Sequence, residues 1–272
     1  MKLYRTDDGV IAESNGRFHS LHDDWNALIN HTDLLGHLRA ATAGQGEATL
    51  RGGTLAPVTS QEVWAAGVTY LRSRSARIDE SKDAGGGTFY DRVYNAERPE
   101  LFFKSSAFRV RGDGEPIRVR GDARWSVPEP ELALYINARG QIIGYTIAND
   151  VSSRDIEGEN PLYLPQAKVY DGSCALGPAV LVTDAALPPE TPIELRIMRD
   201  NSVAFEGSTT FSQLKRTPVE LVGYLYRETS FPDGCVLLTG TGVIPPDQFT
   251  LQSGDDVEIR IPPIGALRNR VE

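Results

Sequence analysis

Hydrophobic and polar residues alternate in short runs along most of the chain, and Gly, Pro, Asn and Asp separate these runs from residue 63 onward. Such alternation puts successive side chains on opposite faces, which is typical of half-buried β-strands. One amphipathic helix is predicted over residues 218–228, because Thr217 can cap its first turn. The predicted strands cover residues 117–119, 132–136, 142–147, 179–182, 193–197, 236–238 and 257–261.

The beginning of the chain has a different pattern. Two strand-like runs, residues 1–4 and 10–12, precede a helix that we expect to begin near Asp23 and Asp24. Its apolar positions are Trp25, Leu28 and Ile29, followed by a second set at Leu34, Leu35 and Leu38. A Gly-rich connector covers residues 44–53. We therefore expect an α+β, β-rich protein with a small N-terminal α/β domain (residues 1–60) and a larger domain (residues 61–272).

Composition and charge limit the possible partners. The 272-residue chain has a net charge of -9 and a pI near 5.1, which argues against nucleic acid and anionic membranes as partners. No segment resembles a signal peptide or is apolar enough to span a bilayer. The two cysteines, Cys174 and Cys235, form no disulfide framework. We expect a cytoplasmic protein, in which an anionic substrate would need local cations or a metal ion.

Three acidic residues are predicted to converge. Glu129 and Glu131 are two apart in a strand-like run, so both carboxylates leave the same face of the strand. Asp150 ends a second run over residues 141–148, and the turn at residues 137–140 would return it to the two glutamates. Three adjacent carboxylates repel one another unless a cation lies between them. An all-oxygen site of this kind suits Mg²⁺, with Mn²⁺ or Ca²⁺ as substitutes.

Other ligand sets and catalytic groups have little support in the sequence. The four histidines, His19, His22, His31 and His37, all lie in the first forty residues, so a Cys/His zinc site or a Ser-His-Asp triad would need them to fold back onto the larger domain. The alternative for Glu129 and Glu131 is the solvated face of an edge strand. Spacing alone favours that alternative, because Glu-x-Glu is a common pattern.

Several motifs together resemble the fumarylacetoacetate hydrolase superfamily, over residues 63–270. They are Phe102-Phe103-Lys104-Ser105, Glu129-Pro130-Glu131-Leu132, Gly144-Tyr145 through Asn149-Asp150-Val151-Ser152-Ser153-Arg154-Asp155, Lys168 before Gly177-Pro178, Thr239-Gly240-Thr241-Gly242 and Gly254-Asp255. The resemblance implies a mixed β-sandwich roll around a Mg²⁺ site, in a homodimer or homotetramer. It also implies that Glu129, Glu131 and Asp150 bind the metal, and that Lys104, Lys168 and Thr241 contact the carboxylate and keto oxygens of a small anionic 2-keto acid.

Lysine is rare in this chain, with five lysines against 23 arginines. A lysine at position 168 therefore hints at a role that a guanidinium group cannot fill, such as proton transfer. The alternative for Lys168 is a solvated surface residue.

One departure from the superfamily pattern bears on the reaction. Hydrolases of the superfamily usually carry Asn-Tyr-x-x-His, with a following Glu, to activate water, whereas this chain has Gly67-Val68-Thr69-Tyr70-Leu71-Arg72-Ser73, with Ser73 near the histidine position. Serine is no general base near neutral pH without an activating partner. The sequence is more similar to the 2-keto-3-deoxy-pentonate (2-dehydro-3-deoxy-D-arabinonate) dehydratase branch, which shares Gly-Val-Thr-Tyr, nearby arginines such as Arg72, and the segment 91–104.

That branch implies catalytic roles for Glu100 and Lys168 and a substrate-binding role for Arg72. The alternative for Glu100 is a salt bridge with Arg98 or a surface position. In the implied reaction a C3 proton and the C4 hydroxyl leave the substrate, and a C5 proton follows to give 2,5-dioxopentanoate. Lys168 is the candidate for proton transfer near C3 and Glu100 for the leaving hydroxyl, although the order of these roles and the C4 stereochemistry stay open.

Two other functions stay open at this point. The first is an acylpyruvate or diketone hydrolase, or an oxaloacetate decarboxylase or tautomerase, with the same metal. The second is a non-catalytic binding protein on the same scaffold. The Arg-rich segment 70–91 ends in three glycines and is expected to form a loop that acts as a lid beside the site.

Overall fold

The structure is a computed structural model that describes residues 1–43, 48–50, 53–73, 75 and 87–272. Most of the Gly-rich connector and of the expected lid loop lies outside these residues. The helical elements are α1 (Trp25–Ile29), α2 (Leu34–Thr42), α4 (Gly87–Asn95), η1 (Ala107–Arg109), α5 (Arg154–Glu159), η2 (Pro161–Tyr163), α6 (Leu164–Lys168), η3 (Phe211–Gln213) and α7 (Pro218–Leu225). The strands are β1 (Lys2–Thr6), β2 (Gly9–Ser14), β3 (Arg17–Leu21), β4 (Glu62–Gly67), β5 (Glu100–Ser105), β6 (Val110–Arg111), β7 (Ser126–Val127), β8 (Pro130–Ile136), β9 (Ile142–Asp150), β10 (Ser152–Ser153), β11 (Cys174–Val182), β12 (Pro192–Arg199), β13 (Ser202–Thr210), β14 (Cys235–Leu238), β15 (Asp256–Ile261) and β16 (Gly265–Arg270).

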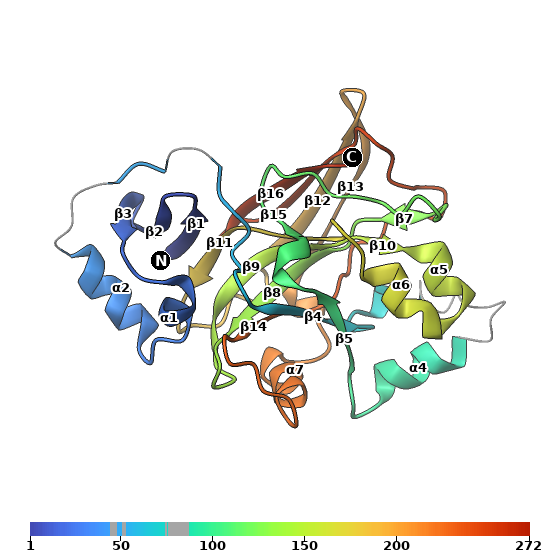
Figure 1. The fold of residues 1–272 in the computed structure, drawn as a ribbon. Coiled ribbons are helices and arrows are strands. Elements are labelled where there is room, and N and C mark those ends of the chain that lie inside the picture. The colour runs from blue at the N-terminus through green and yellow to red at the C-terminus, as the bar shows by residue number, and fades with distance from the viewer. Residues whose placement is uncertain (44–47, 51–52, 74, 76–86) are drawn as a thin grey trace.

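A ten-stranded mixed sheet forms the centre of the molecule (Figure 1). Its order is β3-β2-β1-β11-β9-β8-β14-β4-β5, and β6 pairs with β11. A second sheet, β13-β12-β15-β16, packs on one face, and β7 and β10 form a short pair near α5 and α6. The predicted strand-rich α+β class is confirmed.

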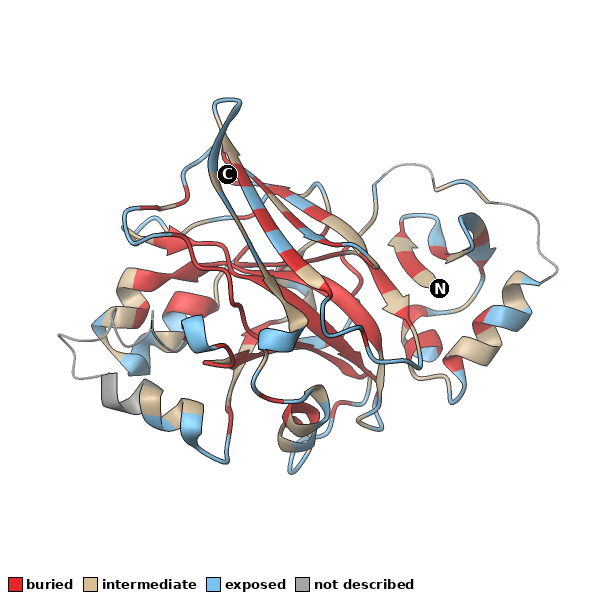
Figure 2. Ribbon diagram, turned by 180° about the vertical axis from the view of Figure 1, so that it is seen from behind, coloured by how far each residue is buried: buried red, intermediate tan, exposed pale blue. Residues whose placement is uncertain are grey.

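Strand β8 lies at the centre of the large sheet and is buried on both faces (Figure 2). Its even-numbered residues, such as Leu132 and Leu134, pack in the core with Leu195 and Ile259 of the second sheet. Its odd-numbered residues, such as Tyr135, pack in a second core that includes residues of α1 and α2. The edge-strand alternative for the two glutamates is therefore wrong, because β9 and β14 flank β8.

The N-terminal segment continues the large sheet. Strand β1 pairs antiparallel with β11, and β2 and β3 extend the sheet outward from it. The apolar positions predicted for one helical region form two helices, because Asp24 caps α1 and Asp33 caps α2. The division into domains at residue 60 stays a prediction.

The sequence pattern located most core strands and missed strands with a weaker pattern. Thr217 caps α7 as predicted, since its side chain accepts a hydrogen bond from the Glu220 N–H. The strand predicted over residues 117–119 is wrong, because only Ile117 makes a bridge, to Val271. Strand β13 was missed because it is an edge strand with largely exposed side chains, which give no apolar alternation.

Candidate active site

The β8–β9 hairpin brings the three predicted carboxylates together. Pro130 pairs with Asn149, and the Asp150 N–H donates to the Glu129 carbonyl oxygen at 3.0 Å. Gly140 turns the chain between the strands with a φ of +73°, a backbone conformation that favours glycine. Glu129, Glu131 and Asp150 are all buried, and each offers a carboxylate oxygen within 4.8 Å of the other two.

Lys168 reaches the same site from the end of α6. Its ammonium group donates to Glu129 Oε2 at 2.7 Å, Asp150 Oδ2 at 3.0 Å and Ser152 Oγ at 2.6 Å. The ammonium also lies 5.6 Å from the centre of the Phe102 ring. Only 1% of Lys168 is exposed, so the alternative of a surface lysine is wrong.

Lys104 lies in the interior and holds Asp150 in place. Its ammonium contacts Asp150 Oδ1 at 2.5 Å and donates to the backbone carbonyls of Val151 at 3.0 Å and Lys168 at 2.6 Å. An ammonium group has three N–H donors, and these three acceptors match them. Lys104 is not among the residues that line the site cavity. Its contact with substrate stays a prediction, and its observed contacts position Asp150.

Burial and mutual repulsion shape the electrostatics of the three carboxylates. Burial raises the pKa of Glu131 well above its ordinary value, and the charges of Asp150 and Glu129 raise this pKa further. Lys168 and the Gly240 N–H, which donates to Glu131 Oε2 at 2.5 Å, act in the opposite direction. A divalent cation would relieve this conflict. The donor set of three carboxylate oxygens therefore fits Mg²⁺.

The buried charges around the site nearly balance. Among the described residues, the four carboxylates of Glu129, Glu131, Asp150 and Glu157 face the three cations of Lys104, Arg154 and Lys168. These seven groups have a net charge of -1. A divalent ion would change the charge of these seven groups to +1, and the Glu100 carboxylate beside the cavity adds one more negative charge when it is ionised.

A small cavity of about 20 Å³, measured as the space open to the centre of a water-sized sphere, lies beside these groups. Ser73 lines it, but the Ser73 hydroxyl donates to the Tyr70 carbonyl at 2.8 Å and accepts from the Tyr70 N–H at 3.1 Å. The Thr241 hydroxyl is similarly bonded to Val243 within its own turn. The lining residues are Ala66, Gly67, Val68, Ser73, Phe102, Glu129, Glu131, Asp150, Lys168, Gly240 and Thr241.

The Glu100 carboxylate lies beside Gly67, a glycine that lines the cavity. Glu100 and Phe102 are two apart on β5, so their side chains leave the same face of the strand. A Cβ atom added at Gly67 would lie 2.2 Å from Glu100 Oε2, so the carboxylate fills the space beside this cavity-lining glycine. Glycine at position 67 is what lets Glu100 reach this place.

Arg72 is not brought into the site cavity. Its side chain donates to the Ile244 carbonyl at 3.2 Å and lines a separate hollow with Tyr70 and Gly242. Arg72 is exposed, whereas Ser73, the next residue in the same helical turn, faces the site. The substrate-binding role of Arg72 stays a prediction.

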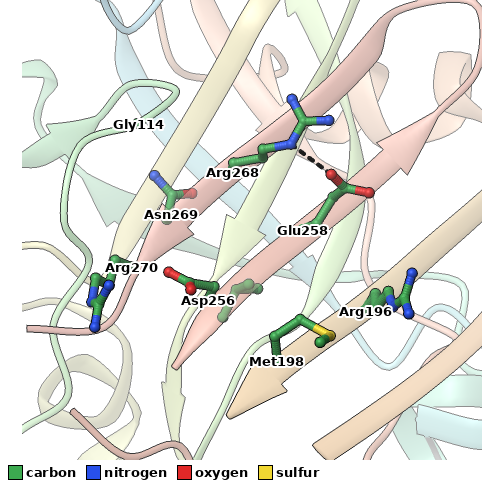
Figure 3. Close-up of a pocket in the computed structure, with 9 residues that line it drawn as sticks. Gly114, Arg196, Met198, Asp256, Glu258, Arg268, Asn269 and Arg270 are labelled. Atoms are coloured by element: carbon green, nitrogen blue, oxygen red, sulfur yellow. Dashed lines mark hydrogen bonds and ion pairs between the residues drawn. The ribbon is translucent and has the colours of Figure 1, made fainter. Parts of the chain in front are cut away.

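A larger hollow lies elsewhere, on the outer face of the second sheet (Figure 3). Charged side chains of β12, β15 and β16 cover it, and acidic and basic residues face each other across the strands, as Arg196 faces Glu258. The Arg268 Nε lies 2.6 Å from Glu258 Oε2. Within the described residues, only the Glu129–Glu131–Asp150 group brings three potential metal ligands together, and these three residues line the smaller cavity.

Three residues that contact the site had no role predicted from the sequence. Ser152 accepts from Lys168, Arg154 contacts Glu129, and Glu157 lies between Arg154 and Lys168. Their only signal was position, since Ser152 and Arg154 lie two and four residues after Asp150 and Glu157 is three residues beyond Arg154. Along the described part of the chain, no helix is long and apolar enough to cross a membrane.

The sequence of this chain is similar to a protein family and to two dehydratases. The family described as fumarylacetoacetate (FAA) hydrolase C-terminal matches residues 72–272. A protein of Haloferax volcanii named probable 2-keto-3-deoxyxylonate dehydratase is 49% identical, over 79% of this chain and 73% of that protein. The 2-dehydro-3-deoxy-D-arabinonate dehydratase of Saccharolobus solfataricus is 45% identical, over 78% of this chain and 72% of that protein.

A solved structure matches the whole fold. It is 2-keto-3-deoxy-D-arabinonate dehydratase complexed with magnesium and 2,5-dioxopentanoate, with a TM-score of 0.85 and 35% sequence identity. The match covers 100% of this chain and 99% of that chain. The fold predicted from the motifs is thereby confirmed.

Proposed function

Because this chain belongs to the fumarylacetoacetate hydrolase family, we propose that its buried carboxylate site is the Mg²⁺ centre of a dehydratase. The reaction converts a 2-keto-3-deoxy-pentonate of the 2-dehydro-3-deoxy-D-arabinonate type into 2,5-dioxopentanoate and water. The observation that carries this proposal is the buried carboxylate triad with the Lys168 ammonium bonded to two of its members. Two relatives and one solved structure of such dehydratases support the substrate class.

The residues present suit the cofactor and the reaction. Glu129, Glu131 and Asp150 would hold the Mg²⁺, which supplies a Lewis acid for the carboxylate and C2 carbonyl oxygens of the substrate when it is bound. Lys168 Nζ takes a proton from C3 as a neutral amine, a form that a bound Mg²⁺ would favour by offsetting the Glu129 and Asp150 charges that now face the ammonium. Glu100 gives a proton to the C4 hydroxyl, which leaves as water.

The remaining steps move protons and break no further carbon–oxygen bond. Glu100, now a carboxylate, takes a proton from C5, and Lys168 returns its proton to C3, which gives the C4–C5 enol. This enol becomes the aldehyde when its hydroxyl proton is lost and C4 gains a proton. One water molecule leaves for each substrate, so carbon is neither oxidised nor reduced overall. The buried cavity limits access of bulk water to the reacting carbon atoms.

Ser73 argues against the alternative of carbon–carbon hydrolysis. That reaction needs a base that activates water, and the Ser73 hydroxyl donates its hydrogen to the Tyr70 carbonyl instead. The complete set of triad carboxylates and Lys168 argues against a non-catalytic binding protein. Dehydration is therefore the reaction that the site supports best.

A substrate screen tests this function. The protein would be incubated with Mg²⁺ and each of the two C4 epimers, and aldehyde formation would be measured. The D epimer is 2-keto-3-deoxy-D-arabinonate, which is the same compound as 2-keto-3-deoxy-D-xylonate, and the L epimer is 2-keto-3-deoxy-L-arabinonate. We expect turnover of at least one epimer, loss of turnover with EDTA, and negligible pyruvate release from acylpyruvates. Acylpyruvate cleavage at a rate comparable to dehydration would overturn the proposal.

We also propose a compartment, a pathway and an assembly for the enzyme. We place it in cytoplasmic pentose catabolism, with a small 2-keto acid as its partner and no nucleic acid or membrane. We also propose a homodimer or homotetramer. Light scattering that gave a stable monomer at micromolar concentration would contradict this assembly.

A further inference from the structure

Arg154 is a buried guanidinium group directly behind one of the triad carboxylates. It begins α5, only 2% of it is exposed, and its Nη2 donates to Glu129 Oε1 at 2.5 Å. Burial of a guanidinium group is costly unless carboxylates match its charge and its donors. The position therefore requires the Glu129 carboxylate to stay in one orientation.

The two oxygens of Glu129 are held by different cations. Arg154 contacts Oε1 and Lys168 contacts Oε2. The other two triad members each have their own support, Asp150 from Lys104 and Glu131 from the Gly240 N–H. Each carboxylate is thus oriented by a group that is not itself a metal ligand, an arrangement that tunes metal affinity in proteins.

Glu157 joins Arg154 to Lys168. It is 1% exposed, and its Oε1 lies 3.6 Å from Lys168 Nζ while its Oε2 lies 3.8 Å from Arg154 Nε. Arg154 and Glu157 are three apart on α5, so the helix itself fixes their separation. Glu157 is a fourth buried carboxylate that faces both cations.

From these contacts we infer that Arg154 and Glu157 are positioning residues for the metal centre. Arg154 fixes the orientation in which Glu129 meets the metal, and Glu157 fixes Arg154 and the Lys168 ammonium relative to each other. This inference rests on the proposed metal centre and goes beyond it, because it assigns the affinity for the ion partly to residues of α5.

Metal titration tests the inference without substrate. Mn²⁺ serves as the probe, because the electron paramagnetic resonance signal of free Mn²⁺ reports binding directly. In Arg154→Met the dissociation constant should rise by about 10- to 100-fold, the usual effect of removing a group that orients a metal ligand. Arg154→Lys should recover part of this loss, since an ammonium keeps the charge but not the planar fork of donors.

A matched control separates positioning from general damage to the fold. Arg199 makes a two-pronged ion pair with buried Asp255 in the second sheet, with both N···O distances at 2.7 Å, and it does not line the site cavity. Arg199→Met should lower the melting temperature and leave Mn²⁺ affinity unchanged.

A second variant tests Glu157. In Glu157→Gln the side chain keeps its size but loses the charge that faces Arg154 and Lys168. Because Glu157 orients these groups and does not line the cavity, kcat should fall more than KM changes.

The possible results are distinct. Unchanged Mn²⁺ affinity in folded Arg154→Met would overturn the inference, and so would an equal loss in Arg199→Met. If Arg154→Met does not fold, Arg154→Lys decides, because wild-type affinity in that variant contradicts a need for the guanidinium geometry. If the wild type binds no Mn²⁺, both the proposed metal centre and this inference are wrong. If the wild type binds Mn²⁺ but does not dehydrate the substrate, only the proposed reaction is wrong.

Discussion

The charge on Glu131 should have opposite effects on stability with and without metal, and Glu131→Gln isolates it. Glu131 is 2% exposed and has a raised pKa, so its carboxylate destabilises the metal-free protein. Glutamine has nearly the same shape and can still accept the hydrogen bond from the Gly240 N–H. The substitution thus removes charge and leaves packing almost unchanged.

The magnitude follows from the distances. Like charges within 4.8 Å repel by about 3.5 kcal/mol per pair at an effective dielectric constant of about 20, and Glu131 has two such neighbours, Glu129 and Asp150. Lys168 and the Gly240 N–H each offset a smaller part of this repulsion. We expect a net gain in the free energy of unfolding of about 1–3 kcal/mol for the metal-free variant, and each kcal/mol raises Tm by about 2–4 °C.

With Mg²⁺ bound, the wild type should be more stable than Glu131→Gln, the reverse of the order expected without metal. The wild type gains about 4.1 kcal/mol when Mg²⁺ is present at about 1,000 times its Kd, which exceeds the metal-free advantage of the variant, whereas the variant, with one ligand charge fewer, gains little. Thermal unfolding with EDTA and with Mg²⁺ measures both effects. The surface substitution Glu258→Gln, far from the triad in the second sheet, serves as control. A Glu131→Gln protein with a lower Tm in EDTA, or with the full Mg²⁺ shift, would refute the reasoning.

The sign of the pH effect can be stated. The pKa of Glu131 in the folded protein exceeds its ordinary value of 4.5. The folded state therefore binds more protons than the unfolded state, and the stability of the metal-free wild type should fall as the pH rises from about 4.5 through the raised pKa. The advantage of Glu131→Gln should accordingly be larger above this window than below it.

Further predictions concern catalysis and metal binding. Glu100→Gln should lower kcat by about 10²- to 10⁴-fold while the Mg²⁺-induced Tm shift stays, which steady-state kinetics and thermal unfolding check. Lys168→Met should lower kcat by a similar factor of about 10²- to 10⁴-fold and raise KM, because the ammonium also faces an anion. Gly67→Ala would put a methyl group 2.2 Å from Glu100 Oε2, so kcat should fall by about 100-fold with Mg²⁺ affinity unchanged. Mg²⁺ affinity should rise with pH, since binding needs the Glu131 carboxylate, and calorimetry in two buffers should detect proton release.

Local rules predicted that the three carboxylates converge, although spacing alone did not favour a buried site. The side-chain period of a strand and the return of a hairpin are short-range properties, and they placed Glu129, Glu131 and Asp150 together before the fold was known. The same rules could not distinguish a buried central strand from an edge strand. That distinction depends on β14, which is about a hundred residues away in the sequence.

The charged residues around the triad were beyond such rules. Spacing gave no reason to bury Lys168, and its predicted role came from the family resemblance and from the rarity of lysine in this chain. Arg154 and Glu157 have the pattern of a solvated helix face, and their burial is tolerable only because tertiary contacts pair them. Lys104 was expected to contact substrate, whereas its donors are directed to Asp150 and two carbonyl oxygens.

One measurement tests the central claim most directly. A ¹H NMR time course would follow 2-keto-3-deoxy-D-arabinonate and its C4 epimer in the presence of the protein, with and without Mg²⁺. The account predicts that the aldehyde proton of 2,5-dioxopentanoate appears with at least one epimer, only when Mg²⁺ is present, and that it is greatly slowed in Lys168→Met. A pyruvate methyl signal in its place, or an unchanged substrate spectrum with Mg²⁺ bound, would contradict a dehydratase.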